Sequence, residues 1–322
     1  MESTTTWLLT LGVLSLVIVF DLTLAIIRRN KETTMTEAGI WTVIYVAAAI
    51  AFGILMPNWT TDPNAQKEFF AGWLTEYALS VDNIFVFVII LSRLQVEKTK
   101  QQLVLLLGII IALVLRGGFI AAGSAIIEKF SGAFFIFGAF LIYTAIHQLF
   151  RSEETDEESE SKLTRFLNKR IAYTETYDGM KLRTMVDGKK TFTPIIVVFI
   201  TLALTDVMFA FDSIPAIFGI TTDGFIVLTA NIFALMGLRQ LYFLLGSLIE
   251  RLRYLEYGIS AILAFIGFKL VSHAMHVNEL PFINGGKHID WAPEISTETS
   301  LIVIVVCLVV SAGASLFIKK KD

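Results

Sequence analysis

Two short segments place pairs of carboxylates inside strongly apolar sequence. EYALSVDN begins at Glu76 and includes Asp82, and DVMFAFDS begins at Asp206 and includes Asp212. A carboxylate at the centre of a bilayer costs roughly 2.5–3.5 kcal/mol on insertion scales, so such residues face a polar interior and mark ion pathways or buried pairs. The sequence therefore indicates a charged site within the membrane.

The two segments share one spacing. In each, the acids are six residues apart and a small amide or hydroxyl side chain follows the second acid, Asn83 in one segment and Ser213 in the other. On a straight helix, positions six apart lie roughly 120° apart around the axis and ~9 Å apart along it. The two acids of a segment therefore either serve different partners or lie on a helix that is interrupted near them.

Side chains and carbonyl groups near these acids supply oxygen ligands. The predicted metal ligands are Glu76, Asp82, Asp206 and Asp212, and the supporting residues are Ser80, Asn83, Thr205, Phe211, Ser213, Pro215 and Asn231. Pro215 has no N–H, so the carbonyl of Phe211 loses its helical partner and becomes a further oxygen ligand. Oxygen ligands suit Mg²⁺, Ca²⁺ or Mn²⁺, whereas zinc and copper usually recruit His or Cys.

Ion pairing with basic side chains of the same chain is the alternative to metal binding by these carboxylates. Arg116, Arg239 and Lys269 lie in or near apolar segments and could neutralise some of the carboxylates. We expect both uses, with some acids paired and at least two left for the ion. Acids that stay unpaired in a buried site favour exchange of a proton for a metal ion.

The composition of the chain defines its class. Of its 322 residues, 55% are hydrophobic and 17% are charged, whereas soluble domains average ~25% charged residues. The apolar residues form blocks of roughly 20, the length that crosses a ~30 Å hydrocarbon core. The sequence predicts one all-α integral membrane domain, a polytopic bundle of about nine helices. The expected spans are residues 7–27, 38–57, 69–92, 102–122, 131–150, 194–217, 226–248, 257–276 and 300–318.

The acid-bearing segments belong to a repeated unit. We expect two N-terminal helices (7–57), a first three-helix repeat (69–150), a charged cytoplasmic loop (151–193), a second three-helix repeat (194–276) and a C-terminal helix (300–318). Because three is odd, the second copy enters the membrane from the opposite side, which gives the inverted repeat typical of secondary transporters. The acidic start of the loop, RSEETDEESESK, is predicted to be disordered.

The distribution of Lys and Arg predicts the orientation. These residues gather after the first, third, fifth, seventh and ninth expected spans, and short cytoplasmic loops carry the excess of positive residues. We therefore expect the N-terminus outside, the C-terminus in the cytoplasm, and a multi-pass protein of the cell (plasma) membrane.

These segments resemble the TerC family of integral membrane proteins, in particular its Alx-type branch. The most specific matches are SVDN at 80–83, FGAFLIYT at 137–144 and DVMFAFDSIPAIFGITTDGFIVLTANIFALMGLRQLYFLL at 206–245. The resemblance implies a place in the LysE-like transporter superfamily, which is built from inverted three-helix repeats. It also implies Mn²⁺ efflux, with the four paired acids as the ion site.

The leading hypothesis is a transporter that exports divalent metal cations, Mn²⁺ by the resemblance, with proton antiport as its coupling. It implies no enzymatic activity and no permanently bound cofactor. Its partners are the lipid bilayer and the transported metal ion, without nucleic acid, and the oligomeric state is left open.

The alternative hypothesis is a non-transport scaffold, or a tellurite or redox resistance protein, whose buried acids are structural. The chain has one cysteine, Cys307, and no recognisable cofactor motif, which disfavours redox chemistry. An intramembrane hydrolase is disfavoured because nothing in the sequence marks a substrate groove. A channel is disfavoured by the inverted repeat.

Overall fold

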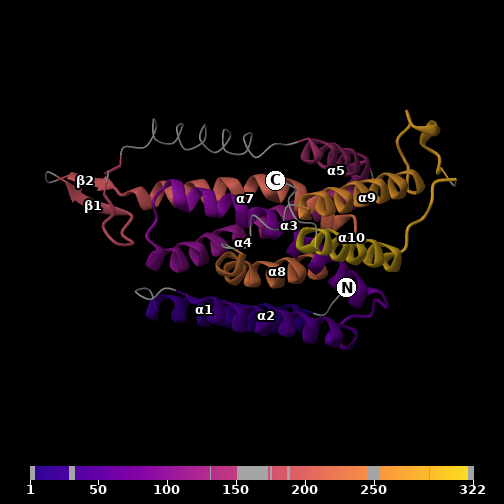
Figure 1. Ribbon diagram of the computed structural model, residues 1–322. Coiled ribbons are helices and arrows are strands. Elements are labelled where there is room, and N and C mark those ends of the chain that lie inside the picture. Colours follow the sequence, from indigo (N-terminus) through magenta and orange to yellow (C-terminus); the bar gives the residue numbers. More distant parts are fainter. Residues whose placement is uncertain are drawn as a thin grey trace.

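The structure, a computed structural model, is a bundle of long helices that run roughly along one axis (Figure 1). It describes residues 4–28, 33–130, 132–150, 173–174, 176–186, 189–245, 254–289 and 291–317, without the side chains of Asp82, Phe85, Glu128, Arg239, Leu245, Leu316 and Phe317. The acidic run at 152–160 therefore lies outside the described residues.

Nine α-helices occupy the described part of the chain, together with one short β-hairpin and two short 3₁₀ turns. The helices are α1 (Thr4–Ile27), α2 (Met35–Leu55), α3 (Ala65–Arg93), α4 (Lys98–Lys129), α5 (Ala133–Leu149), α7 (Pro194–Phe218), α8 (Gly224–Leu245), α9 (Leu255–His276) and α10 (Thr297–Phe317). The hairpin pairs β1 (Arg183–Val186) with β2 (Lys189–Phe192), and the 3₁₀ turns are η1 (Met56–Asn58) and η3 (Asn284–Gly286).

These helices confirm the predicted all-α membrane bundle. By length and composition, eight of them could cross a membrane, and α5 is a shorter apolar helix of 17 residues. Each expected span overlaps one helix, and the largest difference is at α4, which continues to Lys129. Local signals account for several helix starts. Thr34 accepts a hydrogen bond from the backbone N–H of Glu37 at the start of α2, and Pro194 occupies the first turn of α7.

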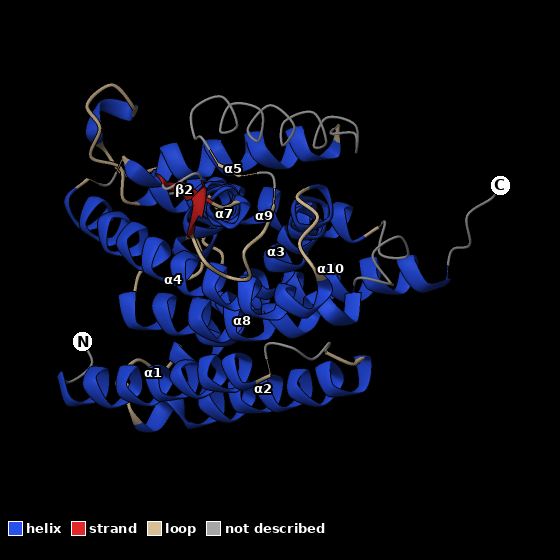
Figure 2. Cartoon of the chain, turned by 90° about the vertical axis from the view of Figure 1, so that its left-hand side faces the viewer, coloured by secondary structure: helices blue, strands red, loops and turns tan. Residues whose placement is uncertain are grey.

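Burial separates central helices from peripheral ones. Most side chains of α3 and α8 are buried, whereas few of those of α1, α2 and α10 are. Figures 1 and 2 agree that α1 and α2 lie along one side of the bundle and that α5 lies on the opposite side. Exposed apolar side chains are stable against lipid tails, so the peripheral helices are suited to contact with the bilayer.

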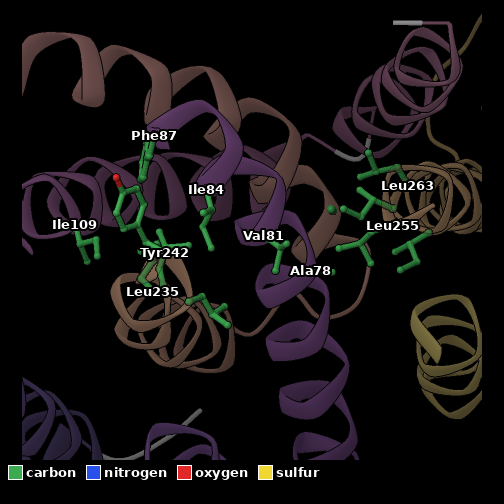
Figure 3. Close-up of a cluster of buried hydrophobic side chains, with 14 of the residues drawn as sticks. Ala78, Val81, Ile84, Phe87, Ile109, Leu235, Tyr242, Leu255 and Leu263 are labelled. Atoms are coloured by element: carbon green, nitrogen blue, oxygen red, sulfur yellow. The ribbon is translucent and has the colours of Figure 1, made fainter. Parts of the chain in front are cut away.

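The central helices pack through one large hydrophobic cluster. Figure 3 shows side chains of α3 beside those of α4, α8 and α9. The labelled members are Ala78, Val81, Ile84 and Phe87 of α3, Ile109 of α4, Leu235 and Tyr242 of α8, and Leu255 and Leu263 of α9. This packing fixes α3, which carries the first acid segment, against α8 and α9.

Helices α5 and α9 approach each other closely at two glycines. A Cβ atom on Gly138 would lie 2.8 Å from the carbonyl oxygen of Gly267, and a Cβ atom on Gly267 would lie 2.8 Å from that of Gly138. Only glycine tolerates this separation, and small residues are the usual device for close helix packing in membranes.

The two ends of the bundle carry different structures. The β-hairpin lies at one end and the segment 277–296 at the other (Figure 1). At the hairpin end, the hydroxyl of Tyr177 donates to the carbonyl of Leu94 between α3 and α4, and burial raises the pKa of Tyr177 to about 12. At the opposite end, Lys67 pairs with Glu298 and so joins the starts of α3 and α10.

Candidate ion site around Arg116

Arg116 of α4 lies at the centre of the candidate site. Its side chain is 1% exposed. Its Nη1 donates to Oε2 of Glu76 on α3 at 2.8 Å. Its Nε and Nη2 donate to Oδ2 and Oδ1 of Asp206 on α7 at 3.2 and 3.1 Å. The second contact is the two-point Arg–carboxylate geometry that gives strong, directional ion pairs.

The helices bring two of the four predicted ligands to this arginine. Glu76 is fully buried and Asp206 is 1% exposed. Nη1 of Arg116 also lies 3.4 Å from Oγ of Ser213, two turns after Asp206 on α7. The predicted ion pairing therefore occurs here, and Arg116 serves both acids at once.

The buried group has an excess of negative charge. When ionised, the two carboxylates of Glu76 and Asp206 carry one more charge than the single guanidinium of Arg116 can balance. Net charge in a low-dielectric interior is expensive unless it is compensated. The group therefore favours one further positive charge, from a bound cation or a proton.

Several buried polar atoms beside this group have no hydrogen-bond partner among the described residues. They include Oε1 of Glu76 and both polar atoms of Asn231 on α8. The Asn231 amide lies beside the Glu76 carboxylate but outside good hydrogen-bond geometry. Such atoms cost roughly 1–3 kcal/mol each when left unsatisfied. The oxygen atoms of this group are therefore suited to bind a small cation.

Further buried oxygen atoms lie on α3 and α7. The hydroxyls of Thr75 and Ser80 are buried without a hydrogen-bond partner in the described part of the chain. Asn83 is also buried, as is Thr205 on α7. Ser80, Asn83, Thr205 and Asn231 were all predicted as supporting residues.

Asp212 lies apart from the arginine. It is half-buried, and its Oδ1 accepts a hydrogen bond from the Thr144 hydroxyl of α5 at 3.2 Å. Helix α7 continues unbroken through Asp206, Asp212 and Pro215. For the two acids of α7, the arrangement found is therefore different partners on one continuous helix. The carbonyl of Phe211 still lacks the N–H that Pro215 cannot supply.

The four predicted ligands do not form one cluster in the part of the chain that the structure describes. Two of them share Arg116 and Asp212 contacts α5, while the side chain of Asp82 lies outside the described residues. Within the described residues, no three His, Cys, Asp or Glu side chains are grouped to hold a metal ion.

The other two basic residues that were predicted as partners of the acids are Lys269 and Arg239. Lys269 of α9 lies near Glu68, at the start of α3. The side chain of Arg239 lies outside the described residues. Thr144 is a site residue that was not predicted, although it ends the FGAFLIYT segment that carries part of the family resemblance.

The fold and this site define an integral, multi-pass membrane protein with a charged centre inside its helix bundle. Comparison with known proteins gives its family. Residues 61–322 match the family described as integral membrane protein TerC family, and the chain belongs to that family.

Similar proteins occur in several bacteria. An uncharacterized membrane protein of Mycobacterium tuberculosis (strain CDC 1551 / Oshkosh) is 41% identical over 313 residues, which cover 96% of this chain and 78% of the relative. One from Myxococcus xanthus is 40% identical over 76% of both chains. A protein of Escherichia coli (strain K12), named as a candidate membrane-bound redox modulator Alx, is 37% identical over 80% of this chain and 83% of its own. No solved structure matches the chain.

Proposed function

We propose that this chain exports divalent metal cations, Mn²⁺ first among them, through the carboxylates at the centre of its bundle, in exchange for protons. The observation that carries the proposal is the buried group of Glu76, Asp206 and Arg116. It holds one more negative charge than positive, and Oε1 of Glu76 and the nearby amide of Asn231 have no well-formed hydrogen bond among the described residues. A cation is the ligand that this arrangement favours.

The position of the site supports transport rather than storage. Its residues come from α3, α4, α7 and α8, which belong to both predicted repeats. The aligned acids Glu76 and Asp206 meet at one arginine, as expected where two inverted repeats face each other. Relative movement of the repeats would then change the side from which the site is reached. The inverted repeat and the N-out, C-in orientation are parts of this proposal.

The test is Mn²⁺ efflux from loaded cells or vesicles at matched membrane levels. Wild type is compared with Glu76→Gln, Asp82→Asn and Asp212→Asn. We expect loss of efflux with normal protein abundance, because each change removes a carboxylate from the path. Arg183→Gln, in the β-hairpin, is the matched control for a change of charge away from the site and leaves efflux unchanged. Normal efflux in all three acid variants contradicts the proposal.

A specific observation favours a second function, that of a non-transport scaffold. The two-point pairing of Asp206 with Arg116 ties α7 to α4, and a buried ion pair can serve to fix helix positions. In that case the acid variants are less abundant or misfolded. The protein that does fold gives the same Mn²⁺ efflux measurement as wild type.

The names of relatives suggest a third role, in redox stress. Cys307 of α10 is partly buried. Replacing Cys307 with serine tests that role in the same cells. Altered resistance to oxidants or tellurite in this variant, together with no Mn²⁺ efflux by wild type, would favour it over transport.

A further inference from the structure

The guanidinium of Arg116 occupies the position between two buried acids that an incoming cation would need. It is a permanent charge, because arginine is not deprotonated in proteins. It uses Nη1 for Glu76, and Nε with Nη2 for Asp206. A divalent cation that bound both carboxylates would displace these contacts, so the arginine and the ion are competitors for the same oxygens.

The two acids are held unequally. Asp206 receives two hydrogen bonds from Arg116, through both carboxylate oxygens. Glu76 receives one, through Oε2, and its Oε1 has no hydrogen-bond partner among the described residues. Breaking one contact is easier than breaking a two-point pair, so Glu76 is the acid that is freer to turn.

We propose that Arg116 is a resident counter-cation that competes with the transported ion. Asp206 retains the arginine, while Glu76 exchanges its single contact with Arg116 for the ion, together with Asn231. The return of Arg116 to Glu76 then expels the ion on the releasing side. This inference rests on the proposed function and adds a step that the four acids alone do not contain.

Counting the charges predicts in which direction the loss of Arg116 changes the affinity for the ion. With Arg116 in place, the centre offers an excess of one negative charge to the ion. With a neutral residue at position 116, two carboxylates face the ion without a competitor. A divalent cation should therefore bind more tightly and leave more slowly when the arginine is removed.

The experiment measures thermal unfolding of the purified full-length protein in detergent during titration with MnCl₂. For Arg116→Gln we expect half-maximal stabilisation at a Mn²⁺ concentration lower than in wild type by roughly 5- to 150-fold, the usual range of coupling between sites. Efflux by the same variant is slower, because the ion is no longer displaced. In the double variant Arg116→Gln/Asp206→Asn, the Mn²⁺ concentration for half-maximal stabilisation returns toward that of wild type. Arg183→Gln, also an arginine-to-glutamine change, leaves it unchanged.

A second variant covers the case in which Arg116→Gln does not fold. Arg116→Lys keeps the charge but cannot form the two-point contact with Asp206. We expect its half-maximal Mn²⁺ concentration to lie below that of wild type and above that of Arg116→Gln.

The outcomes separate the two proposals. If wild type exports Mn²⁺ and the folded variants at position 116 respond to Mn²⁺ as wild type does or more weakly, the competition is wrong and the transporter stands. If no variant responds to Mn²⁺ and wild type shows no efflux, the proposed function fails, and the role of Arg116 fails with it.

Discussion

The ion pairs at the centre of the bundle and those at its ends differ in exposure to solvent, and therefore in their energetic effect. Arg116 and its acids are removed from solvent, with exposed fractions of 0–2% for the three side chains. The Lys181–Asp178 pair beside the hairpin has exposed fractions of 69% and 40%. Surface pairs contribute little to stability because water and salt screen them, whereas buried charges carry a large desolvation cost.

This difference indicates why the buried group exists. A bundle that needed only stability would be served as well by apolar side chains of similar volume, which often replace buried ion pairs without loss. The centre instead retains three charged residues that do not balance one another. Unbalanced charge inside a membrane supports the proposed role in ion transport. The exposed pairs need no such explanation.

The largest expected effect is a ranked loss of stability in the buried group, measured without divalent cations. Arg116→Gln leaves two unpaired carboxylates and is expected to destabilise the protein by about 3–5 kcal/mol. Asp206→Asn leaves Arg116 with Glu76 alone and costs less. Glu76→Gln leaves the neutral two-point pair and costs least. The measurement is the unfolding midpoint of each purified variant in detergent.

An opposite ranking would count against the charge imbalance. If Glu76→Gln were the most damaging of the three variants, the centre would be held by Glu76 and not short of positive charge. The triple variant Arg116→Met/Glu76→Gln/Asp206→Asn serves as the control. It should recover stability relative to Arg116→Gln while showing no efflux.

The gross fold could be predicted from the sequence because the bilayer limits the alternatives. Apolar blocks of roughly 20 residues must form helices, since a membrane leaves no other partner for their backbone groups. The ends of the helices were placed from the apolar blocks alone, and the cap at Thr34 and the proline at Pro194 were not used. The β-hairpin was not predicted, because its two strands are only four residues long and have no regular alternation of buried and exposed side chains.

The site was predicted less completely than the fold. Composition marked the acids and named Arg116 as a possible partner, because charge within an apolar segment is visible in the sequence. Which acids face the arginine depends on how α3, α4 and α7 are rotated, and spacing within one segment does not fix that rotation. The contact between Thr144 and Asp212 joins α5 to α7 across 68 positions of sequence, so it required the tertiary structure.

A half-buried contact should give an intermediate effect. Thr144→Val removes the hydroxyl that donates to Asp212 but keeps the shape of the side chain. We expect a loss of about 1 kcal/mol in stability, the usual contribution of one hydrogen bond, and slower Mn²⁺ efflux, because the carboxylate is less well positioned.

The matched control for that change is Thr42→Val on α2. The Thr42 hydroxyl donates to the carbonyl of Ala38 in its own helix, away from the acids. Efflux by Thr42→Val should equal that of wild type. Equal reductions in efflux for both threonine variants would remove Thr144 from the site.

The smallest expected effect is at the exposed pair beside the hairpin. Lys181 and Thr184 donate hydrogen bonds to Asp178 and hold its pKa below the ordinary value for aspartate. Because the pKa is lowered, any stabilisation is present above the ordinary aspartate pKa and fades as the pH falls through the folded-state value. Exposure of the carboxylate to solvent screens this contribution. We expect Asp178→Asn to leave the unfolding midpoint at neutral pH unchanged within error, in low or high salt. A shift as large as that of Glu76→Gln would show that burial does not divide the ion pairs of this protein into two classes.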